Sequence, residues 1–178
     1  MQTSLRIAAL AVLVAAPAHA DFTVVERGGH WTEAEIVVDA TPTELYALAT
    51  NYERWREVFS DIKSVRVVGG DDRANAKVQF DSRALEHEVT VQFENVPGQA
   101  LRFRGIKGPP GGRARGEYLL ESLDGGTRTR VRARLYMDVV GIAGVFVRDA
   151  ALRRMRQDKL TRDLRDIQQW ASRRHPQS

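Results

Sequence analysis

Residues 117–138 read EYLLESLDGGTRTRVRARLYMD, and the prediction of the fold starts from this segment. Two alternating segments flank an Asp-Gly-Gly sequence at 124–126, which is typical of the turn of a β-hairpin. Because side chains alternate sides along a strand, the second segment predicts one charged face and one apolar face. The charged face carries Arg128, Arg130, Arg132 and Arg134, and the apolar face carries Val131, Ala133, Leu135 and Met137.

The charged face has two interpretations: a surface that binds a polyanion, or the solvated outer side of a sheet. Pairing across the turn places Glu117 and Glu121 beside the arginines. Cross-strand pairs of opposite charge contribute only ~0.2–1 kcal/mol each, but they remove much of the excess charge. The interleaved aromatic residues that single-strand nucleic-acid binders use for base stacking are expected to be absent from this face. The sequence therefore favours a solvated outer face and no nucleic-acid partner.

The first twenty residues are typical of an export signal. Arg6 gives a positive start, residues 7–16 are apolar, and Ala18-His19-Ala20 forms a small-x-small cleavage site. The apolar run is shorter than the ~20 residues that a spanning helix needs, so a retained membrane anchor is the less favoured alternative. We expect cleavage after Ala20 and a single periplasmic or secreted domain of residues 21–178.

Composition narrows the classes of chemistry further. The chain has no cysteine, which excludes disulfides, thiolate metal sites and cysteine nucleophiles. Without Arg6 the expected mature chain has 26 basic and 23 acidic residues, a net charge of +3 that argues weakly for a polyanion partner. The histidines show no metal-ligand spacing, so neither a metal nor another cofactor is predicted.

Hydrophobic periodicity predicts an α+β fold. An alternating strand at 30–39 precedes Thr41-Pro42-Thr43-Glu44, a helix start with a capping box and proline at the first helical position. Two short helices are expected at 42–49 and 52–59. Six further strands follow at 62–68, 74–82, 85–95, 100–106, 117–123 and 128–138, with a loop at 105–116.

A long helix is predicted from about residue 143 to residue 172. Its apolar stripe contains Phe146, Ala150, Leu160, Leu164, Ile167 and Ala171. Arg153 and Gln157 interrupt this stripe. They mark either a ligand-binding rim or the point where the helix passes the sheet edge into solvent. The whole pattern predicts a curved, seven-stranded antiparallel sheet wrapped around this helix.

Three stretches in this order resemble the helix-grip, or SRPBCC/START-like, superfamily. They are residues 37–68 (VVDATPTELYALATNYERWREVFSDIKSVRVV), residues 117–138, and residues 144–155 (GVFVRDAALRRM). The superfamily includes the major birch pollen allergen, START lipid-transfer domains, and the polyketide cyclase/dehydrase and lipid-transport proteins. Residues 51–68 look most like the subgroup with polyketide cyclases and coenzyme-Q-binding proteins. The resemblance covers residues 31–171 and implies an apolar cavity between sheet and helix, without implying one function.

The leading hypothesis is an exported binding or carrier protein for a hydrophobic small molecule, such as a lipid, quinone, sterol-like or polyketide-like compound. Apolar side chains would line the cavity, His87 or Tyr118 would orient a polar head group, and Arg153 would lie at the rim. The expected apolar lining is Phe80, Val89, Val91, Phe93, Leu101, Phe103, Leu120 and Val131.

The alternative hypothesis, that the protein is an enzyme, rests on His87. It is the one clearly polar residue in the apolar stripe of residues 85–93, and its ordinary pKa near 6.5 suits an acid or base in a polyketide cyclase or dehydratase. It can equally be a structural histidine satisfied by a backbone carbonyl, by Tyr118 or by Ser82. No Ser/His/Asp or paired-carboxylate spacing accompanies it, so the sequence favours a binding protein and assigns no catalytic residue.

A third hypothesis is an interaction module. The arginine face would contact a protein or a membrane surface. Separately, the apolar and basic residues of the loops at 105–116 and 139–147 suit transient contact with an anionic membrane. The same two loops are also candidates for the cavity entrance.

Overall fold

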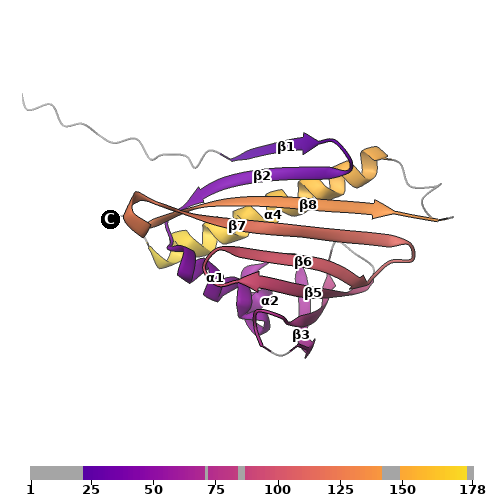
Figure 1. Ribbon diagram of the computed structural model, residues 1–178, viewed down its shortest axis with the longest axis horizontal. Coiled ribbons are helices and arrows are strands. Elements are labelled where there is room, and N and C mark those ends of the chain that lie inside the picture. Colours follow the sequence, from indigo (N-terminus) through magenta and orange to yellow (C-terminus); the bar gives the residue numbers. More distant parts are fainter. Residues whose placement is uncertain (1–21, 71, 84–86, 142–148, 176–178) are drawn as a thin grey trace, which may run out of the picture.

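The computed structural model describes residues 22–70, 72–83, 87–141 and 149–175. Eight antiparallel strands form one curved sheet in the order β1-β2-β8-β7-β6-β5-β4-β3, and the long helix α4 lies across its inner face (Figure 1). The strands are β1 Thr23–Arg27, β2 Trp31–Val38, β3 Ile62–Gly69, β4 Lys77–Ser82, β5 Glu88–Val96, β6 Ala100–Lys107, β7 Gly112–Leu123 and β8 Arg128–Val139. The helices are α1 Pro42–Thr50, α2 Trp55–Val58 and α4 Asp149–Arg174, with 3₁₀ turns η1 Tyr52–Arg54 and η2 Asp124–Gly126.

The predicted fold class is confirmed, with two differences in the sheet. An eighth strand, β1, pairs with β2 at the edge and was not predicted. Strand β7 begins at Gly112, so the expected loop at 105–116 shrinks to a turn between Lys107 and Gly112. The physical reason is that Arg113 and Arg115 already alternate with inward-facing residues, but the surrounding glycines concealed this pattern.

The predicted pairing of the arginine strand is confirmed. Register places Glu117 opposite Arg134 and Glu121 opposite Arg130. On the other side, Glu35 pairs with Arg132 at 2.9 Å. Most of the charge on this stretch of β8 is therefore neutralised by neighbouring strands, and each such exposed pair contributes little to stability.

The same outer face does carry aromatic residues, contrary to the sequence-based expectation. Tyr136 continues the alternation of β8 beyond Arg134, and Trp31 is its partner on β2. The guanidinium groups of Arg115 and Arg134 lie 5.2 Å and 5.1 Å from the Trp31 ring centre. Because the chain's own cations already lie over that ring, it is not an open platform for base stacking.

Helix α1 begins as the sequence predicts. The Thr41 hydroxyl accepts a hydrogen bond from the Glu44 amide at 3.2 Å, and the Glu44 carboxylate accepts one from the Thr41 amide at 2.9 Å. These reciprocal bonds satisfy donors that the helix end leaves free. Among the described residues, no helix is long and apolar enough to cross a membrane.

The interior divides into two apolar clusters. The first lies between α4 and strands β2 and β8, and the second lies under β4 and β5 against η1 and α2. The first contains Ala34, Ile36, Val38, Ala40, Leu45, Val131, Ala133, Leu135, Leu160, Leu164 and Ala171. The second contains Tyr52, Ala76, Val78, Val89, Val91 and Phe93. Helix α4 therefore covers one half of the sheet, while the short helices cover the other.

A buried arginine fixes α4 to the edge of the sheet. Arg156 is only 3% exposed; its Nε donates to the Thr32 hydroxyl at 2.9 Å, and its Nη2 lies 3.0 Å from a Glu26 carboxylate oxygen. The predicted apolar stripe needs correction here, because Ala150 is exposed and Arg156 occupies the buried face; Phe146 lies outside the described residues. A buried charge of this kind is tolerated only when its partners are present.

Replacing this arginine is expected to destabilise the fold. Arg156→Leu removes the buried cation paired with Glu26 and the donor to the Thr32 hydroxyl, so the free energy of unfolding should fall by roughly 3 kcal/mol. Urea denaturation followed by circular dichroism measures the change. Arg154→Leu, on the exposed side of the same helix, should change it by less than about 0.5 kcal/mol. Equal losses of unfolding free energy in the two variants would contradict the role of Arg156 in fixing α4 to the sheet.

Candidate functional site

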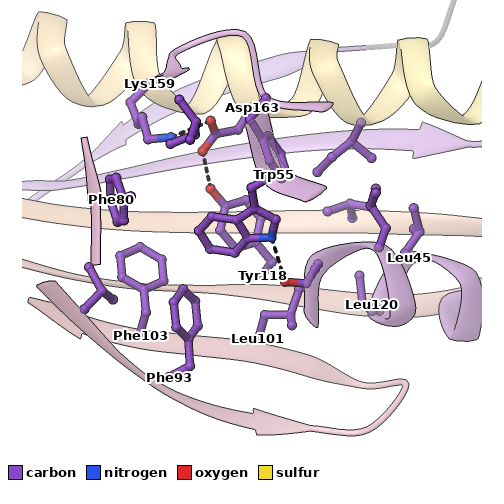
Figure 2. Close-up of a pocket in the computed structure, with 17 residues that line it drawn as sticks. Leu45, Trp55, Phe80, Phe93, Leu101, Phe103, Tyr118, Leu120, Lys159 and Asp163 are labelled. Carbon is purple, nitrogen blue, oxygen red and sulfur yellow. Dashed lines mark hydrogen bonds and ion pairs between the residues drawn. The ribbon is translucent and has the colours of Figure 1, made fainter. Parts of the chain in front are cut away.

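A cavity of about 120 Å³ lies where the two apolar clusters meet, between the inner face of the sheet and helices α1, α2 and α4 (Figure 2). Its walls are almost entirely apolar. The lining residues are Leu45, Leu48, Ala49, Trp55, Phe59, Ile62, Phe80, Val91, Phe93, Leu101, Phe103, Tyr118, Leu120, Val131, Lys159, Asp163 and Ile167.

Aromatic rings in mutual contact form one side of the cavity. Trp55 packs edge-on against Phe93 and Phe59, with ring centres 5.5 Å and 5.7 Å apart. The Trp55 indole N–H donates to the Ala49 carbonyl at 3.0 Å, which fixes the ring's orientation. Phe103 lies 6.0 Å from Phe93 and continues the cluster. These offset and edge-on contacts favour a fixed wall over a collapsible one.

A glycine on β7 makes room for this wall. A Cβ at Gly116 would lie 2.6 Å from the Phe103 ring and 2.4 Å from the Arg134 carbonyl oxygen. Only glycine allows the backbone and the ring to approach this closely. Gly116 therefore positions Phe103 across the strand and toward the cavity.

The polar part of the lining is one connected corner. The Tyr118 hydroxyl donates to Asp163 Oδ2 at 2.5 Å, and Lys159 Nζ lies 2.6 Å from Asp163 Oδ1 (Figure 2). Lys159 also lies 3.6 Å from the carboxylate of Asp61. Tyr118 comes from β7 and the Lys159–Asp163 pair from one turn of α4, so this corner ties the helix to the sheet at the cavity wall.

Asp61, immediately before β3, is the most buried acid of this corner. It is 2% exposed and accepts from the Ser82 hydroxyl at 3.3 Å on Oδ2, and Arg162 lies 3.7 Å from the same atom. Its other oxygen, Oδ1, has no hydrogen-bond partner among the described residues. A buried, unsatisfied carboxylate oxygen makes the corner unfavourable for a second anion.

The pKa values of the corner reflect burial and mutual charge. Burial raises the pKa of Tyr118 well above its usual value near 10, and the charge of Asp163 raises it further. Burial also raises the pKa of Asp163, and Lys159 offsets part of that increase. Burial alone would lower the pKa of Lys159, but the charges of Asp163 and Asp61 outweigh it and raise that pKa. At neutral pH the corner therefore presents a neutral phenol and a protonated amine.

The structure brings together eight of the eleven residues predicted to contact a ligand. They are Phe80, Val91, Phe93, Leu101, Phe103, Tyr118, Leu120 and Val131. Val89 is buried in the second apolar cluster but does not line the cavity. Arg153 is exposed on α4 and lies 4.0 Å from Glu26, so it is not at the rim of the cavity.

The expectation that His87 faces the cavity is wrong. His87 is exposed in a bend immediately before β5, which begins at Glu88. The apolar alternation of 85–93 suggested that the strand started earlier than it does; Leu85 lies outside the described residues. His87 therefore gives no support to an acid–base role in the cavity.

Sequence reasoning missed the charged residues of the site. Asp163 and Lys159 lie on α4, and neither was among the residues predicted to contact a ligand. Asp163 is nevertheless one turn beyond Leu160 and one turn before Ile167, on the helix's inner face. A charged residue at an apolar-stripe position was the available signal, and Arg156 shows the same signal four residues before Leu160.

Comparison with known proteins identifies the family. Residues 29–171 match the family described as polyketide cyclase / dehydrase and lipid transport, and the chain belongs to that family. No curated protein matches the chain.

Solved structures share the fold at low sequence identity. A START superfamily protein from Mycobacterium smegmatis aligns with a TM-score of 0.70 and 11% identity, covering 82% of this chain and 99% of that protein. The Zhui aromatase/cyclase from Streptomyces sp. R1128 aligns with a TM-score of 0.67 and 16% identity, covering 81% and 94%. A protein from Thermus thermophilus aligns with a TM-score of 0.63 and 22% identity, covering 78% and 94%. These similarities show a common fold.

The polar corner predicts a particular loss of stability at alkaline pH. Tyr118 and Lys159 have raised pKa values in the folded state, so the folded protein keeps protons that the unfolded chain releases above about pH 10. The free energy of unfolding should therefore fall as pH rises through this range. Tyr118→Phe removes the contribution of this tyrosine to the pH dependence of the unfolding free energy, which is up to about 1.4 kcal/mol per pH unit. Urea denaturation at pH 8, 10 and 11 measures how the free energy of unfolding changes with pH in the wild-type protein and in the variant. The same pH dependence in both would contradict the burial of an un-ionised Tyr118.

Proposed function

We propose that this protein binds and carries an apolar small molecule in the cavity between the sheet and α4. The observation that supports this most directly is the composition of the wall, where aromatic and aliphatic side chains surround a single polar corner. Such pockets, apolar with few placed polar groups, are typical of small-molecule sites. The Tyr118 hydroxyl and the Lys159 amine are the groups that would orient a polar atom of the ligand.

The size of the cavity limits which part of the ligand it encloses. Its volume of about 120 Å³ is close to that of an engineered cavity of ~150 Å³ that stays dry and binds benzene. A ring or a short branched chain fits in that space without rearrangement. A longer lipid, quinone or polyketide-like compound would project beyond it.

Export is part of the proposal and rests on the N-terminal sequence. The apolar run at 7–16 and the Ala18-His19-Ala20 site support a periplasmic or secreted protein that begins at Asp21. Export would allow the protein to take up its ligand outside the cytoplasm.

Native purification tests the carrier directly. We expect protein isolated from its own host without detergent to release an apolar compound on extraction, detected by mass spectrometry. Leu120→Trp fills the cavity and should lose this compound. Leu119→Trp, one residue away and on the outer face beside Arg132, should keep it. A ligand-free wild-type protein, or equal loss from both variants, would count against the proposal.

A polyketide cyclase or dehydratase is the second candidate, and one observation favours it. The Asp163 carboxylate lies at the cavity surface, hydrogen-bonded to the Tyr118 phenol and with its pKa raised by burial. A carboxylate of raised pKa can take a proton from a carbon beside a carbonyl, and a phenol or carboxylic acid can return one to oxygen. This pair, and not His87, is where acid–base chemistry is available.

Replacing Asp163 separates the two functions. If the protein is a carrier, Asp163→Asn should still bind its ligand, because the apolar wall is unchanged. If it is an enzyme, the same substitution should reduce turnover of a linear poly-β-ketone thioester by at least about 100-fold. Asp158→Asn, exposed on the same helix, is the matched control. Turnover by the wild-type protein that Asp163→Asn abolishes would overturn the carrier in favour of the enzyme.

A further inference from the structure

The cavity adjoins a second hollow that the proposed function does not use. This groove of about 640 Å³, here called the vestibule, lies between α1, the η1–α2 segment and the last turns of α4. Leu48 lines both the cavity and the vestibule. The vestibule residues are Thr43, Glu44, Ala47, Leu48, Asn51, Arg54, Glu57, Val58, Trp170, Arg173 and Arg174.

The helices that enclose the vestibule also enclose the cavity. On the α2 segment, Phe59 faces the cavity and the preceding Val58 faces the vestibule. On α4, Ile167 lines the cavity and Trp170, one turn later, lines the vestibule. The half-buried Leu48 stands between the two spaces. The cavity and the vestibule therefore share one side, at the junction of these helices.

The vestibule has positive charge that its own acids do not neutralise. Glu57 is paired with Arg54 at 2.8 Å, and Glu44 is engaged by the Thr41 amide at 2.9 Å and by His175 at 3.3 Å. No carboxylate of the described residues pairs with Arg173 or Arg174, and the Arg174 guanidinium lies 5.0 Å from the centre of the Trp170 ring.

A position at the end of a helix already favours these two cations, because the helix dipole is negative there. Within the described residues their guanidinium groups donate no hydrogen bond, and such N–H donors bind carboxylate, sulfonate or phosphate oxygens well. Trp170 beside them offers an apolar surface next to the charge.

The inner end of the cavity, in contrast, is unfavourable for an anion. Asp163 and Asp61 place two carboxylates at the polar corner, and Lys159 is already paired with both. A ligand anion brought into this corner would lie close to buried acids, which is unfavourable at low dielectric. An amphiphilic ligand is therefore expected to insert its apolar end first.

We propose that the vestibule is a subsite for an organic anion, so that the ligand is an amphiphile whose ring or chain fills the cavity while its acidic group lies against Arg173 and Arg174. This rests on the proposed function, since it assigns the orientation and the charge of the same ligand. It also makes Leu48 the side chain that the ligand must pass.

Two fluorescent probes of nearly the same shape test the subsite. N-phenyl-1-naphthylamine is neutral, and 1-anilinonaphthalene-8-sulfonate is the same skeleton with one anionic group. We expect the wild-type protein to bind both. The double variant Arg173→Gln/Arg174→Gln should weaken binding of the sulfonate by about ten-fold, the size expected for two exposed charge pairs, and change binding of the neutral probe by less than two-fold. Leu48→Trp should weaken binding of both probes.

The matched control removes the same charge from elsewhere on α4. Arg154→Gln/Arg165→Gln lowers the net charge equally at exposed positions outside the vestibule and should leave both affinities unchanged. One contrary result is that the wild-type protein binds the neutral probe while the vestibule variant and the control variant have the same affinity for the sulfonate. That result would overturn the anion subsite and leave the carrier proposal standing. If the wild-type protein binds neither probe, the carrier and the subsite both fail.

Discussion

Hydrogen bonds and an ion pair made by buried charged side chains attach α4 to the rest of the fold. The position of the site depends on these contacts. Arg156 fixes the N-terminal half of the helix to Thr32 and Glu26, and Asp163 fixes its centre to Tyr118. Further along, Asp166 accepts hydrogen bonds from the Ser60 amide at 2.7 Å and its hydroxyl at 2.9 Å. Such directional bonds hold the helix at a defined distance from the strands, whereas a purely apolar face could settle into the available space.

The cavity follows from this attachment. Helix α4 covers β2 and β8, and the short helices cover β4 and β5 with aromatic residues, so an apolar seam remains between the two clusters. The aromatic side is itself rigid, because Trp55 is hydrogen-bonded to the backbone and packed edge-on against Phe93. A preformed apolar space bordered by one polar corner is suited to holding a molecule whose shape is complementary and whose polarity is confined to a few atoms.

Much of this fold could be predicted from sequence because it depends on local periodicity. Alternation along β8 correctly placed Val131 inside and Arg130 outside, and pairing across the turn gave its glutamate neighbour. The position of His87 could not be obtained this way, since alternation does not show where a strand begins. Asp163 stands at an apolar-stripe position, which is a local signal, but its partner Tyr118 is 45 residues away along the chain and no local pattern shows that contact.

The proposed function requires an apolar molecule in the space between the sheet and α4. Methyl-labelled NMR spectra recorded with and without N-phenyl-1-naphthylamine test it most directly, because aromatic rings shift nearby methyl signals. We expect shifts at Leu101, Leu120, Val131 and Ile167, which line the cavity, and none at the exposed Val25, Val67 and Val68. Unchanged cavity methyls, or shifts confined to the exposed valines, would contradict it.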